Sequence, residues 1–241
     1  GAVKLPNTVR EAYLNLSWSR KEATPLVDTD WEVAYDQFVL AGNKNTTAYR
    51  PQKAGETAFV VDKNTGALSS LTLDGKELLA APITLSLFRP ATDNDNRDRN
   101  GARLWRKAGL NNLTQKVVSL KEEKTSATVR AEILNGKGQK VGMADFVYAL
   151  DKNVRTTFQP DTAIVKSMAC LGLTFRMADA YNQVSYLGRG DHETYIDRNQ
   201  SGRIGLYDTT VERMFHYYAT PQSTANRTDV RWAKLTDQAG E

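Results

Sequence analysis

Residues 58–79 read AFVVDKNTGALSSLTLDGKELL, and this stretch decides the fold class. Runs of apolar and β-favouring residues lie on either side of two turn sequences, Asn64-Thr65-Gly66 and Asp74-Gly75. Asp-Gly is favoured in the two-residue type I′ turn that joins adjacent antiparallel strands. The stretch therefore predicts two consecutive hairpins, which form an antiparallel meander.

The same pattern continues along the chain. Short β-rich runs separated by Gly, Asn and Asp turns predict further strands at 115–120, 126–134, 142–150, 154–158, 165–175 and 183–187. Helix signals are scarce, and the sequence predicts one short helix at 102–108 that Gly109 ends. Many strands at this spacing predict an all-β protein built as a sandwich.

The first 43 residues predict a separate piece of sheet. Leu14, Leu16 and Trp18 alternate with polar residues, as in a half-buried strand, and a second strand is predicted at 31–40. Two strands cannot stand alone, and a small sandwich needs about seven. We therefore expect residues 1–43 to be the end of a sandwich whose other strands precede Gly1. Residues 44–241 would form a second domain, after a polar linker at 41–53.

Composition restricts the function classes. The 241 residues are 40% hydrophobic and 25% charged, which is typical of globular proteins and argues against disorder. The net charge of +4 comes from basic residues interleaved with acids, so we expect neither a nucleic acid nor a membrane as partner. The single cysteine, Cys170, excludes an internal disulfide, and we expect a buried, inert thiol in the strand at 165–175. The sequence does not define a compartment.

Polar side chains are densest in residues 186–198, which read YLGRGDHETYIDR. The glycines permit positive φ or a close backbone approach, so the polar side chains around them can be aimed at one point. Two further segments have a similar character. Residues 88–96 read FRPATDNDN, and residues 221–232 read PQSTANRTDVRW.

These three segments, in this order, resemble signatures of the C-terminal small-chain region of lac-type β-galactosidases of glycoside hydrolase family 2. The resemblance covers residues 44–241. It implies that residues 1–43 are the C-terminal strands of an immunoglobulin-like sandwich. It also implies that residues 44–241 are the N-terminal part of the large antiparallel supersandwich shared with galactose mutarotases, truncated at its C-terminus.

The resemblance implies a reaction for the parent enzyme. Family members hydrolyse terminal non-reducing β-D-galactose residues with retention, which requires two carboxyl groups about 5–5.5 Å apart. In the family both are glutamates of a TIM barrel that precedes the immunoglobulin-like domain. We therefore expect no catalytic residue in this chain, and no activity from the chain alone. The expected partners are the barrel of the parent chain, β-galactoside saccharides, and a second copy through unpaired sheet edges.

Sugar recognition uses carboxylate, arginine and asparagine side chains for hydroxyls and an aromatic face for the apolar side of the ring. The resemblance implies that the first two segments help to shape the saccharide-facing cleft. The carbohydrate-facing candidates are Arg89, Asp93, Asn94, Asp95, His192, Glu193, Tyr195, Arg198 and Trp232. Taken as isolated residues, each of these types more often has a structural role.

Residues 93–98 alternate oxygen-bearing side chains, as a calcium loop does, but the match fails in detail. Asp98 stands where an EF-hand loop needs glycine, and Leu104 stands where it needs glutamate. We therefore expect no metal and no cofactor in this chain. The short polar side chains are expected to cap turns and to hold Arg89 or Arg97 in a bidentate ion pair.

Three functions from different classes remain open: non-catalytic support of a β-galactosidase, a stand-alone carbohydrate-binding or mutarotase-like module, and a scaffold without a ligand. A mutarotase would use a histidine and a glutamate as general acid and base. His192 and Glu193 are adjacent, so on an extended strand they would point to opposite faces. Tyr181, Tyr186 and His216 are expected to be packed residues.

Overall fold

The computed structural model describes residues 11–42, 55–99, 101–149 and 154–240. The chain forms two compact units. Unit 1 comprises Gly1–Arg50, Gln183–Phe215 and Ala225–Leu235, and unit 2 comprises Pro51–Asn182, His216–Thr224 and Thr236–Glu241. The predicted domain boundary at residues 43 and 44 and most of the predicted linker lie outside the described residues. The two-domain division therefore stays a prediction.

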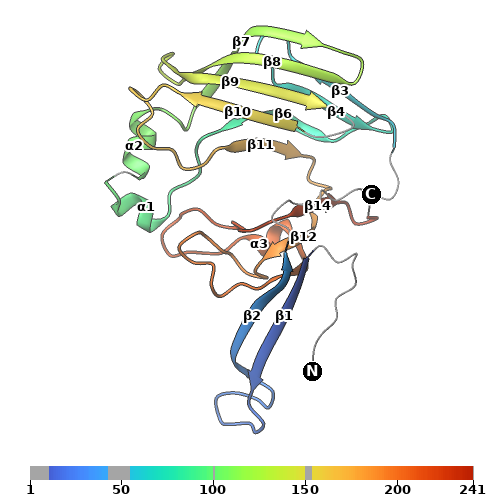
Figure 1. The fold of residues 1–241 in the computed structure, drawn as a ribbon, viewed down its shortest axis with the longest axis vertical. Helices are drawn as coiled ribbons and strands as arrows, with labels where there is room; N and C mark the ends of the chain where they lie inside the picture. Colours follow the sequence, from blue (N-terminus) through green and yellow to red (C-terminus); the bar gives the residue numbers. More distant parts are fainter. Residues whose placement is uncertain (1–10, 43–54, 100, 150–153, 241) are drawn as a thin grey trace. The chain divides into compact units, whose positions relative to one another are not determined.

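Two antiparallel sheets build unit 2 (Figure 1). One has the strand order β11-β6-β4-β3, with β5 paired to β4, and the other has the order β10-β9-β8-β7. The strands are β3 (Thr57–Val61), β4 (Leu68–Leu73), β5 (Lys76–Glu77), β6 (Leu79–Ser86), β7 (Leu113–Glu122), β8 (Ser126–Asn135), β9 (Lys140–Ala149), β10 (Val154–Pro160) and β11 (Gly172–Met177). These sheets confirm the predicted all-β, antiparallel fold class.

The predicted meander is confirmed at both turns. Strand β3 pairs antiparallel with β4, and β4 pairs antiparallel with β5. Asp74 has a φ of 50° and Gly75 a φ of 80°, which is the pair of positive angles that a type I′ turn requires. Gly66 has a φ of 70°, so the first turn also uses a left-handed glycine.

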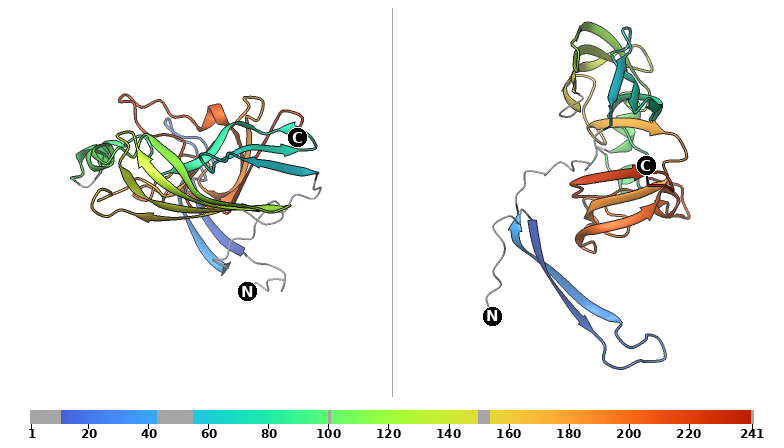
Figure 2. Two further views of the ribbon diagram at one scale, coloured as in Figure 1. Left: turned by 90° about the horizontal axis from the view of Figure 1, so that it is seen from above. Right: turned by 90° about the vertical axis from the view of Figure 1, so that its right-hand side faces the viewer.

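Alternating side chains of the two sheets form the core between them. Every second residue is buried from Ala127 to Asn135 in β8 and from Gly142 to Tyr148 in β9, including Val129, Ile133 and Phe146. Apolar residues of β3, β4 and β6 belong to the same core cluster. The two sheets of unit 2 therefore form a sandwich, which Figure 2 shows from two further sides.

Two short helices precede β7. They are α1 (Asp93–Arg97) and α2 (Ala102–Lys107). Helix α2 confirms the predicted short helix, and Gly109 follows it with a φ of 70°. Helix α1 was not predicted. None of the helices in the described part of the chain is long and apolar enough to cross a membrane.

The predicted strand at 165–175 is wrong over its first half, because strand β11 begins only at Gly172. The amides of Ile164 and Val165 both donate to the carbonyl oxygen of Asp161, which folds this segment into a turn. Cys170 therefore lies outside the strand. It is half-buried rather than buried, with its Sγ 3.7 Å from the carbonyl oxygen of Ser86.

Unit 1 contains a two-stranded sheet and a three-stranded sheet of order β13-β12-β14. Its elements are β1 (Glu11–Ser19), β2 (Glu32–Gly42), β12 (Gln183–Arg189), β13 (Ile204–Thr210), α3 (Val211–Met214) and β14 (Trp232–Thr236). Strands β1, β2 and β12 match predicted strands. Tyr186 of β12 is buried, as predicted, and so is Tyr181 of unit 2.

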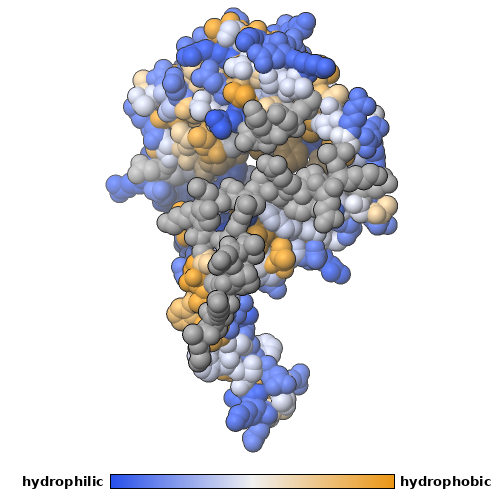
Figure 3. Space-filling model, turned by 45° about the vertical axis from the view of Figure 1, so that its right-hand side comes forward, coloured by the Kyte–Doolittle hydropathy of each residue, from blue (hydrophilic) through white to orange (hydrophobic). Residues whose placement is uncertain are grey.

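The hairpin of β1 and β2 confirms the two predicted strands, but the half-buried face predicted for the first strand is wrong, because residues 14–19 are all exposed. Leu14 pairs with Phe38 across the hairpin, so both side chains lie on the same face. Their exposed fractions are 40% and 47%, and that of Trp18 is 52%. Figure 3 shows apolar patches on this hairpin.

Candidate functional site

The first motif segment forms the start of helix α1 in unit 2. Thr92 is the N-cap residue, and its hydroxyl accepts a hydrogen bond from the amide of Asp95 at 3.3 Å. The carboxylate of Asp95 accepts in return from the amide of Thr92 at 2.7 Å. This reciprocal capping box satisfies two amides that the first helical turn would otherwise leave unpaired. Asp95 is therefore a helix-capping residue in this structure.

Arg89 holds the same carboxylate in a bidentate ion pair. Its Nη1 lies 2.6 Å from Oδ2 of Asp95, and its Nη2 lies 3.2 Å from Oδ1. The guanidinium carbon also lies 5.5 Å from the centre of the Trp105 ring. Burial opposes ionisation of Asp95, but the hydrogen bonds from Arg89 and Thr92 outweigh it and keep the pKa of that carboxyl below its ordinary value. The predicted bidentate pair is thus confirmed for Arg89.

Asp93 and Asn94 lie in the exposed first turn of α1. The amide of Asp93 donates to Oε1 of Gln222 at 3.2 Å, and the amide of Ser223 donates to the carbonyl oxygen of Ala91 at 3.2 Å. Both partners come from the beginning of the third motif segment. Within unit 2, one backbone–side-chain and one backbone–backbone hydrogen bond therefore join the first and third segments.

The second motif segment begins in the last residues of β12 and continues as a loop of unit 1 whose backbone needs Gly190. Gly190 has a φ of 107°, and a β-carbon added there would lie 2.4 Å from the carbonyl oxygen of His192. This arrangement turns Glu193 inward, where only 6% of its surface is exposed. Its Oε2 accepts a hydrogen bond from the amide of Ala225 at 2.7 Å, and its Oε1 lies 3.8 Å from Nη1 of Arg198. The Glu193 carboxylate is thus part of the loop's internal structure.

Thr194 and Asn226 link the second and third segments within unit 1. The amide of Thr194 donates to the carbonyl oxygen of Asn226 at 3.0 Å, and Nδ2 of Asn226 donates to the carbonyl oxygen of Thr194 at 2.7 Å. The fully buried hydroxyl of Thr194 accepts from the amide of Thr228 at 2.9 Å. The two motif segments therefore form one hydrogen-bonded network, in which Thr194 and Thr228 were not among the predicted site residues.

His192 lies on the outer side of the same loop. Its Nδ1 is 3.0 Å from Oδ1 of Asp191, and its Nε2 is 2.8 Å from the hydroxyl of Ser201. The hydrogen bond from His192 lowers the pKa of the Asp191 carboxyl below its ordinary value. His192 is half-exposed and Glu193 is buried, so the two side chains do point to different sides, although they lie in a loop and not on a strand.

The remaining candidates also fall in unit 1. Tyr195 is buried, and its amide and carbonyl pair with those of Arg198 at 3.2 and 2.9 Å. The side chain of Arg198 is exposed, and Trp232 is half-buried at the start of β14. His216, in unit 2, packs edge-on against Tyr218 at 4.4 Å between ring centres, as predicted for an aromatic neighbour.

The structure therefore brings the candidates together in two groups. Arg89, Asp93, Asn94 and Asp95 lie in unit 2, and His192, Glu193, Tyr195, Arg198 and Trp232 lie in unit 1. Within each group, the buried and half-buried acids hold backbone amides and arginines. Within the part of the chain that the structure describes, no three His, Cys, Asp or Glu side chains are grouped so as to hold a metal ion.

Comparison with known proteins finds similarity to β-galactosidases. The family model described as the β-galactosidase small chain matches residues 53–240. A β-galactosidase of Priestia megaterium is 27% identical over 97% of this chain and 24% of its own length. Those of Actinobacillus pleuropneumoniae and Kluyveromyces lactis are 22% and 28% identical over 92% and 73% of this chain. The chain spans about a quarter or less of the length of these curated relatives. The share is 24% for the Actinobacillus pleuropneumoniae protein and 18% for the Kluyveromyces lactis protein. Because the family model covers most of its residues, this chain belongs to the β-galactosidase small-chain family.

Proposed function

We propose that this chain is a non-catalytic part of a retaining β-galactosidase, where it supports the catalytic barrel and one side of the saccharide cleft. The observation that carries the proposal is the use of the motif carboxylates. Asp95 caps a helix and holds Arg89, and Glu193 holds the amide of Ala225. Carboxylates that accept these hydrogen bonds stabilise loops and are not available as a nucleophile or an acid/base.

The whole enzyme would hydrolyse terminal non-reducing β-D-galactose residues. A retaining mechanism needs two carboxyl groups about 5–5.5 Å apart, one of which attacks the sugar. In this proposal both come from a TIM barrel outside this chain. The nine carbohydrate-facing candidates then have two tasks. Buried Glu193 and Tyr195 and half-buried Asp95 fix the loops, and exposed side chains such as Asp93 and Arg198 reach the saccharide.

The proposed partners follow from the same arrangement. They are the barrel of a longer β-galactosidase chain, β-galactosides, and a second copy of the chain through the edges of its sheets. The chain itself would need no cofactor. Light scattering tests the association of copies, because a monomer that persists at high protein concentration argues against pairing of sheet edges.

Two assays test the main proposal. The folded chain alone is expected to release no nitrophenol from nitrophenyl β-galactoside. The second assay adds the chain to the Priestia megaterium β-galactosidase from which the matching quarter has been deleted. We expect the two proteins to co-purify and to hydrolyse the substrate only as a mixture. Hydrolysis by the chain alone would contradict the proposal, and so would a folded chain that neither binds the deleted relative nor restores its activity.

A further inference from the structure

Three side chains of unit 1, Asp191, His192 and Ser201, form a hydrogen-bonded triad that the support of a catalytic barrel does not require. Nδ1 of His192 lies 3.0 Å from Oδ1 of Asp191, and its Nε2 lies 2.8 Å from the hydroxyl oxygen of Ser201. A carboxylate, an imidazole and a hydroxyl in this order are the arrangement in which a serine becomes a nucleophile, and it is recognised by geometry rather than by position in the chain. The triad is therefore suited to acyl-transfer chemistry.

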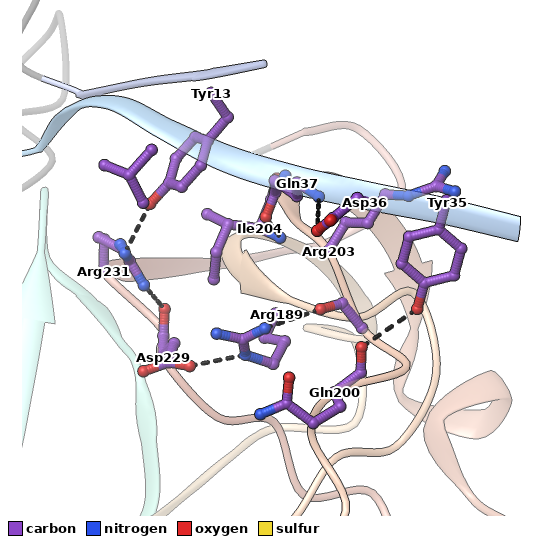
Figure 4. Close-up of a pocket in the computed structure, with 12 residues that line it drawn as sticks. Tyr13, Tyr35, Asp36, Gln37, Arg189, Gln200, Arg203, Ile204, Asp229 and Arg231 are labelled. Atoms are coloured by element: carbon purple, nitrogen blue, oxygen red, sulfur yellow. Dashed lines mark hydrogen bonds and ion pairs between the residues drawn. The ribbon is translucent and has the colours of Figure 1, made fainter. Parts of the chain in front are cut away.

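Ser201 lies in a turn that other parts of unit 1 hold on both sides. The hydroxyl of Tyr35, in β2, donates to the carbonyl oxygen of Gln200 at 3.2 Å (Figure 4). Nη1 of Arg189, at the end of β12, donates to the carbonyl oxygen of Gly202 at 2.9 Å. Both neighbours of Ser201 are thus tied to strand residues, so the serine is positioned before any substrate arrives.

The acid and the imidazole of the triad are held by the end of β12. Gly190 follows the last residue of this strand, and its amide donates to the carbonyl oxygen of Arg203 at 2.9 Å. Nη2 of Arg227 donates to the carbonyl oxygen of Asp191 at 3.2 Å. Arg203 directly precedes β13, which pairs with β12. The triad is therefore built on the ends of two paired strands, and such elements hold a site more precisely than free loops do.

The electrostatics of the triad favour the tautomer that activation of the serine needs. The hydrogen bond from His192 keeps the pKa of the Asp191 carboxyl below its ordinary value, so this carboxylate is ionised at neutral pH and only accepts hydrogen bonds. The neutral imidazole therefore carries its proton on Nδ1, toward Asp191. Nε2 then accepts the hydrogen bond from the Ser201 hydroxyl, and it is the atom that can take the serine proton.

The exposure of the triad selects the kind of substrate. Ser201 is exposed, and the side chains of Asp191 and His192 are 82% and 39% exposed. An open site of this kind admits a small ester but offers little apolar surface to a long acyl chain.

The amide of Ser201 has no hydrogen-bond partner among the residues that the structure describes. The amide of the nucleophile itself is one of the two donors of the oxyanion hole in the serine-protease arrangement. Loss of one such donor lowers kcat by about 10²–10³. We therefore expect slow turnover, which esters with a good leaving group make measurable.

We propose that the triad hydrolyses small carboxylic esters, with Ser201 as the nucleophile, His192 as the general base and acid, and Asp191 as the positioning residue. Oγ of Ser201 bonds to the ester carbonyl carbon while its proton passes to Nε2 of His192. The bond between that carbon and the alcohol oxygen breaks, and the alcohol leaves with the proton. Water then adds to the acyl carbon and gives a proton to Nε2. The bond to Oγ breaks, Oγ takes this proton back, and the carboxylic acid leaves.

The inference goes beyond the proposed function and does not rest on it. It concerns an ester bond and not a glycosidic bond, and the triad belongs to this chain with or without a catalytic barrel. Nitrophenyl β-galactoside contains no ester, so its hydrolysis remains a test of the proposed function alone.

The test is covalent labelling of the full chain with diisopropyl fluorophosphate, followed by peptide mass spectrometry. The phosphorus of this reagent bonds to an activated serine oxygen, and fluoride leaves. We expect the label on Ser201 and none at this position in Ser201→Ala. Ser185→Ala is the matched control, because Ser185 donates to the carboxylate of Asp208 at 2.5 Å with no histidine between them. This variant should be labelled at Ser201 as fast as the unchanged chain.

Turnover is measured with 4-nitrophenyl acetate. The unchanged chain should release more than one equivalent of nitrophenol. In Ser201→Ala the rate should fall to that of the chain already blocked by diisopropyl fluorophosphate.

Two further variants separate catalysis from structure. His192→Gln should slow the labelling of Ser201 about a hundredfold, because general-base catalysis contributes about 10²–10⁴. Asp191→Asn should slow it about tenfold, because an exposed carboxylate acts through water and contributes less than a buried one. The new amide can donate to Nδ1, so the ¹⁵N signals of the His192 ring should show its proton moving to Nε2. A purely structural role of Asp191 would not produce this change of tautomer.

Three results would overturn the inference. One is a folded chain in which diisopropyl fluorophosphate leaves Ser201 unlabelled. Another is labelling of Ser201 at an unchanged rate in His192→Gln. A third is nitrophenol release that is the same in Ser201→Ala as in the unchanged chain. Urea unfolding checks that each variant is folded, and Ser201→Ala removes one exposed hydroxyl but none of the bonds that hold the turn.

Discussion

The sandwich of unit 2 and the loop network of unit 1 are held together by different interactions. The sandwich core consists of apolar side chains such as Val129 and Phe146, which are fully buried between two sheets. The loop network places buried polar side chains, Glu193 and Thr194, against backbone groups of residues 225–228. Burial of apolar area is non-directional, whereas each hydrogen bond depends on one partner at one distance.

This difference decides how each region responds to substitution. A smaller side chain in the sandwich loses contact area and leaves a cavity, and the neighbours recover part of the loss by moving. A missing acceptor in the loop network leaves a buried amide with no partner, and no small movement replaces it. The sandwich should therefore show large effects that scale with volume, and the loop network should show smaller effects that depend on a single atom.

The largest effect is expected for Phe146→Ala in β9. Phe146 is fully buried, so the substitution should reduce the free energy of unfolding by about 3–5 kcal/mol. Val147→Ala is the control, because Val147 is the next residue of the strand, faces the other way and is 37% exposed. Urea unfolding, together with amide hydrogen exchange in β8 and β9, measures the loss of stability in each of the two variants. Equal effects of the two substitutions would contradict the assignment of the core face.

The next effect is expected for Thr194→Val in the loop network. The variant keeps the shape of the side chain but removes the hydroxyl that accepts a hydrogen bond from the amide of Thr228. The free energy of unfolding should therefore fall by about 1–3 kcal/mol. Hydrogen exchange should accelerate at the amide of Thr228. Thr128→Val on the exposed face of β8 is the matched control, with an expected change within about 0.5 kcal/mol. If Thr194→Val has as little effect as this control, the network is not what holds the loop.

The sandwich could be predicted from the sequence because its signals are local. Asp74 and Gly75 identify a turn by themselves, and the alternation in β8 and β9 identifies a buried face. Helix α1 was missed although its signal is also local. Thr92 is followed three residues later by Asp95, which is a variant of the capping-box pattern with aspartate in place of glutamate.

The loop network could not be predicted in the same way. The residues that pair there are 32 to 34 positions apart, as Glu193 and Ala225 are, and no periodicity relates them. The resemblance identified the segments 186–198 and 221–232 but not the contacts between them. The strand predicted at 165–171 is wrong for a related reason. A turn at Asp161 overrides the strand preference of the apolar residues in this segment.

A smaller effect is expected at the cap of helix α1. Asp95→Asn removes the ion pair with Arg89 and should cost about 1 kcal/mol at pH 7. Because the folded-state pKa of Asp95 is lowered, its stabilisation is present above the ordinary aspartate pKa of about 3.9 and is lost as the pH falls through the folded value. The stabilities of the two proteins should therefore converge below that pH. Asp93→Asn in the same exposed turn is the control, and a difference that persists in acid would exclude the carboxylate as its source.

The smallest effect is expected for the ion pair of Arg231 with Glu11, which joins two parts of unit 1 that are 220 positions apart. Its Nε and Nη2 lie 3.0 and 2.7 Å from Oε1 of Glu11. The side chains are 23% and 21% exposed, so water and salt weaken the attraction, and a double-alanine cycle should give a coupling of about 0.5–1 kcal/mol. High salt should reduce this coupling but leave the effect of Thr194→Val unchanged, because only the former is an attraction between two charged side chains that solvent partly reaches. A coupling as large as the Thr194→Val effect that also resisted salt would contradict this expectation. The hairpin would then be held in unit 1 as firmly as the loop network is, and the contrast between internal hydrogen bonds and partly exposed ion pairs would not hold there.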